Sequence, residues 1–333
     1  MEFDRRMLDI DAVAETERLT GFLRDSVRGE LRRQGAVLGI SGGVDSAVVL
    51  ALCARAFGPE RVLAVMLPEK ESDPESERLA REAAAACGVE PARHEITAVL
   101  EAFGCYRMRD DAIRRVFPEY EPARGYRAKL VLPPDLLERD ALNIFSLAIE
   151  GPGDVRLSKP APPGELRQIT AASAFKQRTR MAVLYYYAEL KHFAVIGTPN
   201  KNEHDQGFFV KHGDGGADVR PIVHLFKTQV YQLAEHLGVP EEIRRRPPTT
   251  DTYSAPCTQE EFFFRLPFAV MDLLWCAMER GIPTAEAAAG MGLTEEQVRR
   301  VYNDLERKAR TTAYLRMAAL EPSARETACA TRV

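Results

Sequence analysis

The sequence predicts an α/β fold: a doubly wound parallel sheet flanked by helices, with a largely helical C-terminal region. Three observations support this class. Short apolar runs alternate with helical stretches between residues 36 and 97, the turn ISGGVDSAV at 40–48 joins one such run to a helix, and helical periodicity dominates after residue 226. Alternating strands and helices are typical of a parallel sheet. We expect one domain over residues 1–333.

The N-terminal part supplies most of the sheet. Ligands of such sheets bind at the carboxyl ends of the strands, where the SGG turn falls. From apolar periodicity and turn residues, we expect a helix within 11–34, a strand at 36–40, a helix at 46–57, a strand at 61–67, a helix at 74–87 and a strand at 93–97.

Periodicity then weakens over residues 104–168, which are rich in proline, glycine and arginine. This stretch predicts an insertion that acts as a lid or subunit contact, or a surface loop without a role. The tail at 321–333 is expected to be disordered. The later elements are expected as a helix at 173–190, a strand at 193–197, helices at 226–237, and a helical part at 259–310 with helices at 259–264, 267–280, 284–290 and 294–309.

Charge and composition limit the partners and the compartment. A net charge of -4 and a pI near 6.0 do not fit a strongly basic nucleic-acid footprint. No apolar run is long enough to cross a bilayer, and residues 1–10 are charged rather than signal-like. The six cysteines are scattered without a CxxC pair. We therefore expect a cytoplasmic protein that binds neither nucleic acid nor membrane.

The stretch 39–46 is predicted to bind phosphate. Glycines at a strand-to-helix turn let backbone N–H groups point inward, and the helix N-terminus adds a partial positive charge. Asp45 would be repelled by phosphates unless a cation such as Mg2+ lay between them. The alternative is an ordinary turn with Asp45 as an N-terminal helix residue. The residues that carry this prediction are Ser41, Gly42, Gly43, Asp45 and Ser46.

A second polar segment, residues 197–221, follows the predicted strand at 193–197. Thr198 stands at the end of that strand, and Glu203 could be the second oxygen ligand of an ion held by Asp45. Lys211 and Asp218 flank a Gly-Gly turn. A solvated hairpin would also explain this composition. Lys227 and Thr249 follow, the former near a predicted helix start and the latter after Pro247-Pro248.

Together these motifs resemble ammonia-dependent NAD synthetases, within the ATP pyrophosphatases that share the SGGxDS loop and a Rossmann-like, adenine nucleotide alpha hydrolase type of fold. The resemblance covers most of residues 10–310, apart from 104–168. The motifs that carry it are SGGVDS at 41–46, QRTRM at 177–181, Gly197-Thr198 with Glu203, KHGDGGAD at 211–218, LFKTQV at 225–230 and Pro247-Pro248-Thr249.

The resemblance implies a two-step amidation. ATP adenylates the carboxylate of deamido-NAD (nicotinic acid adenine dinucleotide), pyrophosphate leaves, and ammonia attacks to give NAD and AMP. ATP would be the co-substrate and Mg2+ the metal. It further implies catalytic roles for Asp45, Ser46 and Lys227, ATP binding by residues 39–46 with Thr198, Lys227 and Thr249, metal binding by Asp45 and Glu203, and substrate binding by Arg178, Lys211, Asp218, Arg307 and Lys308.

Three features depart from that family. Arg307-Lys308 stands where a His-Lys pair is usual, residues 104–168 are longer than the family needs, and 262–265 replaces a Leu-Gly pair. An AMP-forming amide ligase for another carboxylate is therefore the alternative. A tRNA-modifying enzyme would need a basic domain or catalytic cysteines, and a nucleotide sensor should have lost Asp45 or Glu203.

The family resemblance also implies a homodimer. Since only one predicted helix precedes the phosphate loop, we expect free ammonia, or ammonia from a separate glutaminase, as the nitrogen source.

Overall fold

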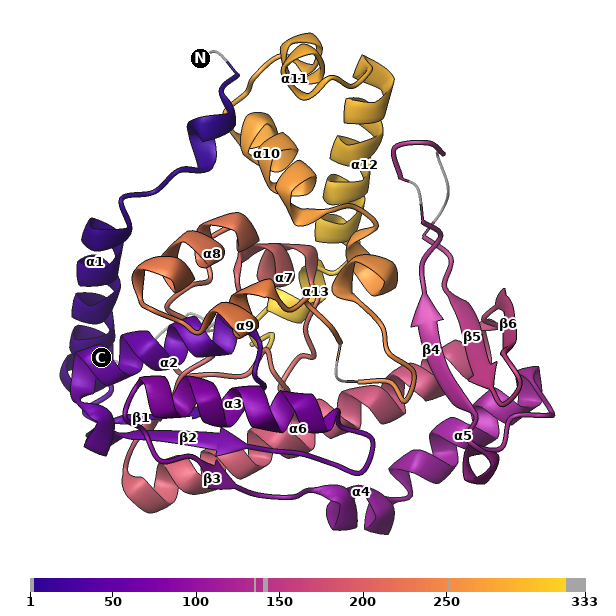
Figure 1. Ribbon diagram of the computed structural model, residues 1–333, viewed down its shortest axis with the longest axis horizontal. Helices are drawn as coiled ribbons and strands as arrows, with labels where there is room; N and C mark the ends of the chain where they lie inside the picture. The colour runs from indigo at the N-terminus through magenta and orange to yellow at the C-terminus, as the bar shows by residue number, and fades with distance from the viewer. Residues whose placement is uncertain (1–2, 135, 140–142, 251, 322–333) are drawn as a thin grey trace, which may run out of the picture.

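The computed structural model describes residues 3–134, 136–139, 143–250 and 252–321 (Figure 1). Its parallel sheet consists of β1 (Ala36–Gly39), β2 (Val62–Met66), β3 (Ala92–Arg93) and β7 (Ala194–Val195). The strand order is β3-β2-β1-β7, and all three pairings are parallel. The predicted parallel sheet is confirmed.

Helices cover both faces of this sheet. They are α1 (Ala12–Arg24), α2 (Val44–Phe57), α3 (Pro74–Ala86), α4 (Thr97–Phe103), α6 (Pro163–Lys191) and α8 (Lys227–His236). Successive strand residues face opposite sides of a sheet. Ala36 and Leu38 of β1 therefore pack in the core formed by α1, α2, α3 and α8, whereas Val37 packs with α4 and α6. The sheet is buried on both faces, which explains its apolar strands.

The strand order reverses between β1 and β7, where the chain returns to the sheet after a long excursion. Val37 of β1 pairs with Val195 of β7. The segments that follow these two strands therefore leave the sheet next to each other. In doubly wound sheets this switch point is the usual ligand-binding crevice.

Residues 104–168 are more regular than the sequence predicts. They form α5 (Cys105–Val116) and an antiparallel sheet of β4 (Arg127–Val131), β5 (Ser146–Gly151) and β6 (Val155–Pro160), and α6 begins at Pro163 rather than at Ser173. The prediction of weak regularity was wrong because only a few alternating residues, such as Leu147 and Ile149, are buried on one face. Whether the segment acts as an insertion or lid stays a prediction.

The C-terminal part is helical, as predicted. It contains η5 (Glu260–Phe264), α10 (Phe268–Glu279), α11 (Thr284–Met291), α12 (Glu295–Thr311) and α13 (Ala313–Arg316). Met7 and Leu8, from the N-terminal turn η1 (Arg5–Leu8), pack in the core of this helical part. The remaining short elements are η2 (Asp25–Glu30), η3 (Pro59–Arg61), η4 (Pro122–Arg124), α7 (Lys201–Gln206) and α9 (Glu241–Arg245).

The tail at 321–333 was predicted to be disordered. Apart from Glu321, it lies outside the described residues. Among the described helices, none combines the length and apolar character needed to cross a membrane.

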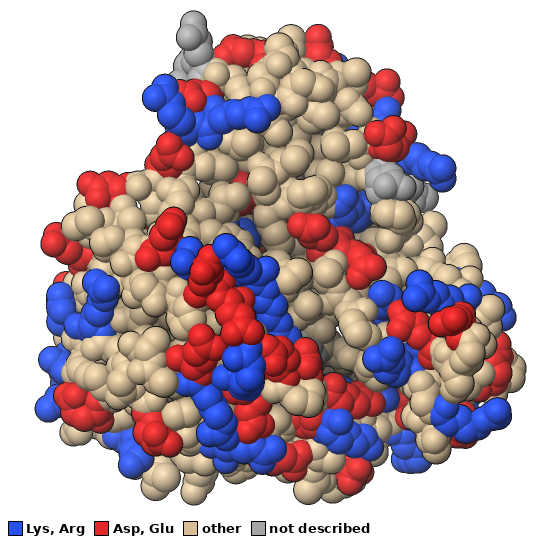
Figure 2. Space-filling model, in the orientation of Figure 1, with Lys and Arg blue, Asp and Glu red and all other residues tan. Residues whose placement is uncertain are grey.

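Lys, Arg, Asp and Glu are interspersed over the face drawn in Figure 2. Exposed ion pairs contribute about 0–1 kcal/mol each, so the fold depends mainly on its buried cores.

Gly42 offers a test of the turn between β1 and α2. It has φ +74°, and a Cβ there would lie 2.5 Å from the carbonyl oxygen of Ser76 in α3. We expect Gly42→Ala to lower the free energy of unfolding by about 2–4 kcal/mol, because left-handed strain and a backbone clash add. Urea denaturation measures this change.

Gly29→Ala is the matched control. A Cβ at Gly29 meets no heavy atom within 4 Å, so its free energy of unfolding should stay within about 1 kcal/mol of wild type. Equal urea midpoints for Gly42→Ala and wild type would contradict the role given to Gly42.

Candidate active site

Two adjoining cavities lie at the carboxyl ends of the strands. The first has a volume of about 400 Å³ and is walled by the ends of β1 and β2 and by α6. The second, of about 150 Å³, lies at the N-terminus of α2. Both are lined by Ser41, Ser46, Ser76 and Thr198. The shared wall allows one elongated ligand to occupy both.

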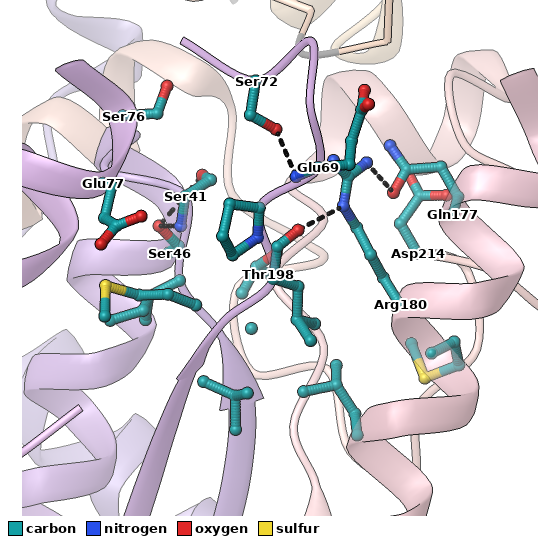
Figure 3. A pocket seen from close by; sticks show the side chains of 18 of the residues that line it. Ser41, Ser46, Glu69, Ser72, Ser76, Glu77, Gln177, Arg180, Thr198 and Asp214 are labelled. Carbon is teal, nitrogen blue, oxygen red and sulfur yellow. Dashed lines mark hydrogen bonds between the residues drawn. The ribbon is translucent and has the colours of Figure 1, made fainter. Parts of the chain in front are cut away.

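The first cavity combines an apolar floor with a polar rim. Its apolar residues include Val65, Met66, Leu67, Met181, Leu184 and Ile196. Figure 3 shows Ser41 and Ser46 on one side and Arg180 with Gln177 on the other. Arg180 donates from Nε to the Leu67 carbonyl oxygen at 3.2 Å and from Nη1 to Gln177 Oε1 at 3.4 Å. An apolar slot with a few placed polar groups suits a flat heteroaromatic base.

The second cavity begins at the glycine-containing turn. Gly43 is the N-cap residue of α2, and no side chain caps this helix end. Ser46 Oγ donates to the Gly43 carbonyl at 2.9 Å, and Gly43 N donates to Ser41 Oγ at 3.3 Å. The first turn of α2 therefore presents backbone N–H groups to the cavity, where an anion would be stabilised by them and by the helix dipole.

A buried ion pair crosses the second cavity. Lys227 Nζ donates to Asp45 Oδ2, and Asn200 Nδ2 donates to Asp45 Oδ1 at 3.0 Å. The Lys227 side chain is only 1% exposed. Burial alone would lower the pKa of Lys227, but the charges of Asp45 and Glu203 outweigh it and raise that pKa. Lys227 is therefore a fixed positive charge beside the turn.

Glu203 is the second carboxylate of this cavity. Its Oε2 accepts from Asn200 N at 3.2 Å, and its Oε1 accepts from Gln259 Nε2 at 3.1 Å. Burial, followed by the charge of Asp45, raises the pKa of Glu203 to about 8. Two carboxylates in one small cavity favour a bound cation. Mg2+ is commonly held by one or two carboxylates together with phosphate oxygens and water, so the donor set fits this ion.

Most predicted nucleotide residues line the two cavities. Those in the first are Gly39, Ile40, Ser41, Ser46 and Thr198; those in the second are Ser41, Gly43, Val44, Asp45, Ser46, Thr198, Glu203, Lys227 and Thr249. Gly42 lines neither, because its Cα faces α3. Within the described residues, no group of three or more His, Cys, Asp or Glu forms a metal site.

The predicted substrate residues lie outside the walls of both cavities. Arg178 Nε donates to the Lys211 carbonyl at 3.2 Å, and Lys211 Nζ donates to the carbonyls of Tyr314 and Met317 at 3.1 and 2.8 Å. Asp218 accepts from Val195 N at 2.8 Å. These groups have partners within the chain, and their contact with a substrate stays a prediction.

The last predicted pair lies on α12. Lys308 is buried, with Nζ 2.7 Å from Asp304 Oδ2 and 2.7 Å from the Phe263 carbonyl oxygen. Arg307 is partly exposed on the same helix. Burial lowers the pKa of Lys308, although Asp304 opposes this effect. Lys308 therefore ties α12 to η5, and a substrate role for either residue stays a prediction.

Sequence reasoning missed Asn200 and Gln259. Asn200 caps α7 through a capping box: its Oδ1 accepts from Glu203 N at 3.0 Å, while Glu203 reaches back to Asn200 N. Asn200 thus links the two carboxylates of the second cavity. The capping-box spacing of Asn200 and Glu203 was a readable signal. Gln259 had none, because it reaches Glu203 from a distant segment.

Comparisons with known proteins extend these observations. A family model described as NAD synthase matches residues 15–124 and 156–313, which leaves 125–155 outside it. The chain is 51% identical over 310 residues to an NH(3)-dependent NAD(+) synthetase of Mesorhizobium japonicum, covering 93% of this chain and 96% of that protein. An enzyme of the same name from Thermotoga maritima is 36% identical over 264 residues, covering 79% of this chain and 86% of that protein.

Solved structures show the same fold. An NH3-dependent NAD synthetase from Campylobacter jejuni has a TM-score of 0.59 at 23% identity, covering 94% of this chain and all of that one. An NMN synthetase from Francisella tularensis has a TM-score of 0.60 at 22% identity, covering 95% and 100%. At these identities the likeness concerns the fold alone.

Asn200 can be tested apart from catalysis. The residue is fully buried, caps α7 and binds Asp45. Asn200→Ala should lower the free energy of unfolding by about 2–4 kcal/mol, because it removes a cap and leaves buried polar groups unpaired. Urea denaturation at neutral pH gives the value.

Thr294→Ala is the control for the cap alone. Thr294 forms a capping box at the exposed N-terminus of α12, so its loss should cost about 1 kcal/mol. A cost for Asn200→Ala no greater than that for Thr294→Ala would show that the bond to Asp45 contributes nothing to stability.

Proposed function

Because the chain belongs to the NAD synthase family, we propose that it makes NAD from deamido-NAD, ammonia and ATP, releasing AMP and pyrophosphate. The protein is therefore a carbon–nitrogen ligase. The observation that carries the proposal is the second cavity, where Lys227, Asp45 and Glu203 lie beside the uncapped N-terminus of α2. This arrangement suits the charged end of a nucleoside triphosphate.

The reaction needs ATP because a carboxylate is a poor electrophile. A carboxylate oxygen of deamido-NAD attacks the α-phosphorus of ATP, and the bond to pyrophosphate breaks. Ammonia then attacks the carbonyl carbon of the acyl-adenylate, AMP leaves with the original carboxylate oxygen, and the nitrogen loses a proton. Since the carboxylate is activated through AMP, no side chain has to form a covalent bond.

The residues of the second cavity stabilise negative charge on the phosphates of ATP. The ammonium of Lys227 and the N–H groups of the α2 turn stabilise the negative charge that grows on the departing pyrophosphate. Asp45 holds Lys227 in place through their ion pair. Asp45 and Glu203 would hold Mg2+, which when bound supplies positive charge to the phosphate oxygens. Thr198 and Thr249, which also line this cavity, would contact ATP through their hydroxyls.

The first cavity would hold the adenosine part of ATP. Its apolar floor and the rim formed by Arg180 and Gln177 fit a purine ring. Thr198 and the two serines of the turn line both cavities. A nucleotide lying across that shared wall would have its base in the first cavity and its phosphates in the second.

We propose a homodimer as the working form. Tyr186 and Leu190 on α6 are 60% and 63% exposed, and Val99 and Phe103 on α4 are about half exposed. Large apolar side chains left exposed on a helix favour contact with another protein surface.

The five free cysteines in the described part of the chain fit a reducing compartment such as the cytoplasm.

One observation favours a different acid as the substrate. Lys308, predicted to bind the dinucleotide, already binds Asp304 and the Phe263 carbonyl oxygen. A ligase that kept the ATP site but acts on another carboxylate is therefore the second candidate. Ammonia would be free or would come from a separate glutaminase.

The proposal is tested by incubating the purified protein with ATP, Mg2+, ammonium and deamido-NAD and quantifying NAD and AMP. We expect equal amounts of both products from wild type, and neither from Asp45→Asn, which removes the charge paired with Lys227. Asp9→Asn, an exposed carboxyl outside both cavities, is the control and should match wild type. Folded, ATP-binding protein that forms no NAD would favour the second candidate.

A further inference from the structure

A second buried charge cluster lies beside the first cavity, apart from the groups assigned above. At its centre is Lys176 of α6, whose side chain is 1% exposed. Its Nζ lies 2.8 Å from Glu69 Oε1 and 2.8 Å from Glu71 Oε2. Both glutamates belong to the loop between β2 and α3. One ammonium thus pairs with two carboxylates of the same loop.

Other groups complete the hydrogen bonding of these carboxylates. Tyr106 of α5 donates its hydroxyl to Glu69 Oε2 at 2.6 Å, and Arg109 of the same helix binds both oxygens of Glu71, with Nη2 2.7 Å from Oε1. Burial opposes ionisation of Glu71, but the Arg109 bond and the charges of Lys176 and Arg109 outweigh it and lower the pKa of Glu71 to about 2. Glu71 therefore stays charged at neutral pH.

The loop held by this cluster is a wall of the first cavity. Leu67, Pro68, Glu69, Ser72 and Asp73 all line it. Buried ion pairs with complete hydrogen bonding hold their elements rigidly, and loss of one partner leaves an uncompensated buried charge. The position of this wall therefore depends on the cluster, although no group of α5 lines the cavity.

Lys176 also reaches toward the second cavity. Its Nζ is 3.5 Å from the Thr252 carbonyl oxygen. Thr252 follows the segment of Pro247, Pro248 and Thr249 that lines the second cavity, and Gln259 lies on the same wall. One ammonium is thus in contact with the loop that walls the first cavity and with Thr252, three residues after Thr249 of the second cavity.

We propose that Lys176 is a positioning residue for the nucleotide, which holds both walls of the ATP site in register without touching the ligand. This inference rests on the proposed function, because it takes ATP as the nucleotide. Removal of the ammonium leaves the buried Glu69 without its cation while Glu71 stays paired with Arg109, so the loop moves away. ATP then binds less tightly, while the groups that act on the reacting phosphate keep their places.

The test measures binding of ATP with Mg2+ to the full chain by calorimetry, and then steady-state kinetics. Lys176→Met should weaken ATP binding roughly tenfold or more, because a lost buried partner costs several times RT. The KM for ATP should rise by a similar factor while kcat falls less than about threefold. Lys176→Arg, which keeps the charge, should recover most of the affinity.

The control is Lys191→Met, on the same helix as Lys176. Lys191 is exposed at the end of α6 and lines neither cavity, so its loss should change ATP affinity less than about twofold. If Lys176→Met does not fold, Glu71→Gln provides the same test, since it removes one carboxylate that Lys176 binds, and should weaken ATP binding severalfold.

Folded Lys176→Met or Glu71→Gln with wild-type ATP affinity would overturn the inference. A roughly tenfold loss of kcat with an unchanged KM for ATP would overturn it too, because a residue that positions the ATP site acts on ATP binding. The calorimetric measurement of ATP binding needs no carboxylate substrate. Wild-type protein that binds ATP but makes no NAD would therefore contradict the proposed function and leave this inference standing.

Discussion

The pairing of β7 with β1 is the constraint on which the site depends. Asp45 and Asn200 are 155 positions apart in the chain, yet their side chains are hydrogen-bonded at 3.0 Å because the strands before them are neighbours. Lys227 joins the same carboxylate from the start of α8. Three segments thus meet at the switch point of the sheet. No one of them contains the site by itself, so the fold must form before the site exists.

Three buried lysines each connect two different elements of the fold. Lys227 with Asp45 joins α8 to the phosphate turn, Lys176 joins α6 to the loop after β2, and Lys308 joins α12 to η5. Replacing such pairs with apolar residues is often neutral for stability. We therefore interpret them as contacts that fix how these elements sit against one another rather than as the main source of stability.

The antiparallel sheet of residues 127–160 supports this geometry from outside. The backbone of Ala128 in β4 accepts from Ala255 N at 3.2 Å, and Leu132 N donates to the Glu261 carbonyl at 3.2 Å. Tyr253 is buried in the same core as β4 and β5. The sheet thus packs against the segment that follows Thr249, which lines the second cavity. Residues 125–155, which include β4 and β5, lie outside the match to the family model.

Local patterns predicted much of this arrangement. The alternation of strands and helices predicted the parallel sheet, and SGGVDS placed Asp45 at the N-terminus of α2. The carboxylate pair was predicted from the polar segment that follows the strand at 193–197, and both groups do line one cavity. Long-range partners could not be predicted, because Gln259 and Lys176 find their acceptors through tertiary packing. Strands β4 to β6 were missed because each alternating pattern is short and the connections between them contain Pro133, Pro134 and Pro152.

The central claim is that the two cavities together activate a carboxylate through AMP. The most direct measurement uses deamido-NAD with a heavy oxygen isotope in its nicotinate carboxylate and locates the isotope by mass spectrometry after turnover. If a carboxylate is activated through AMP, one labelled oxygen should appear in the phosphate of AMP for each NAD formed. Label that stays out of AMP, or appears in inorganic phosphate with ADP as the nucleotide product, would contradict it.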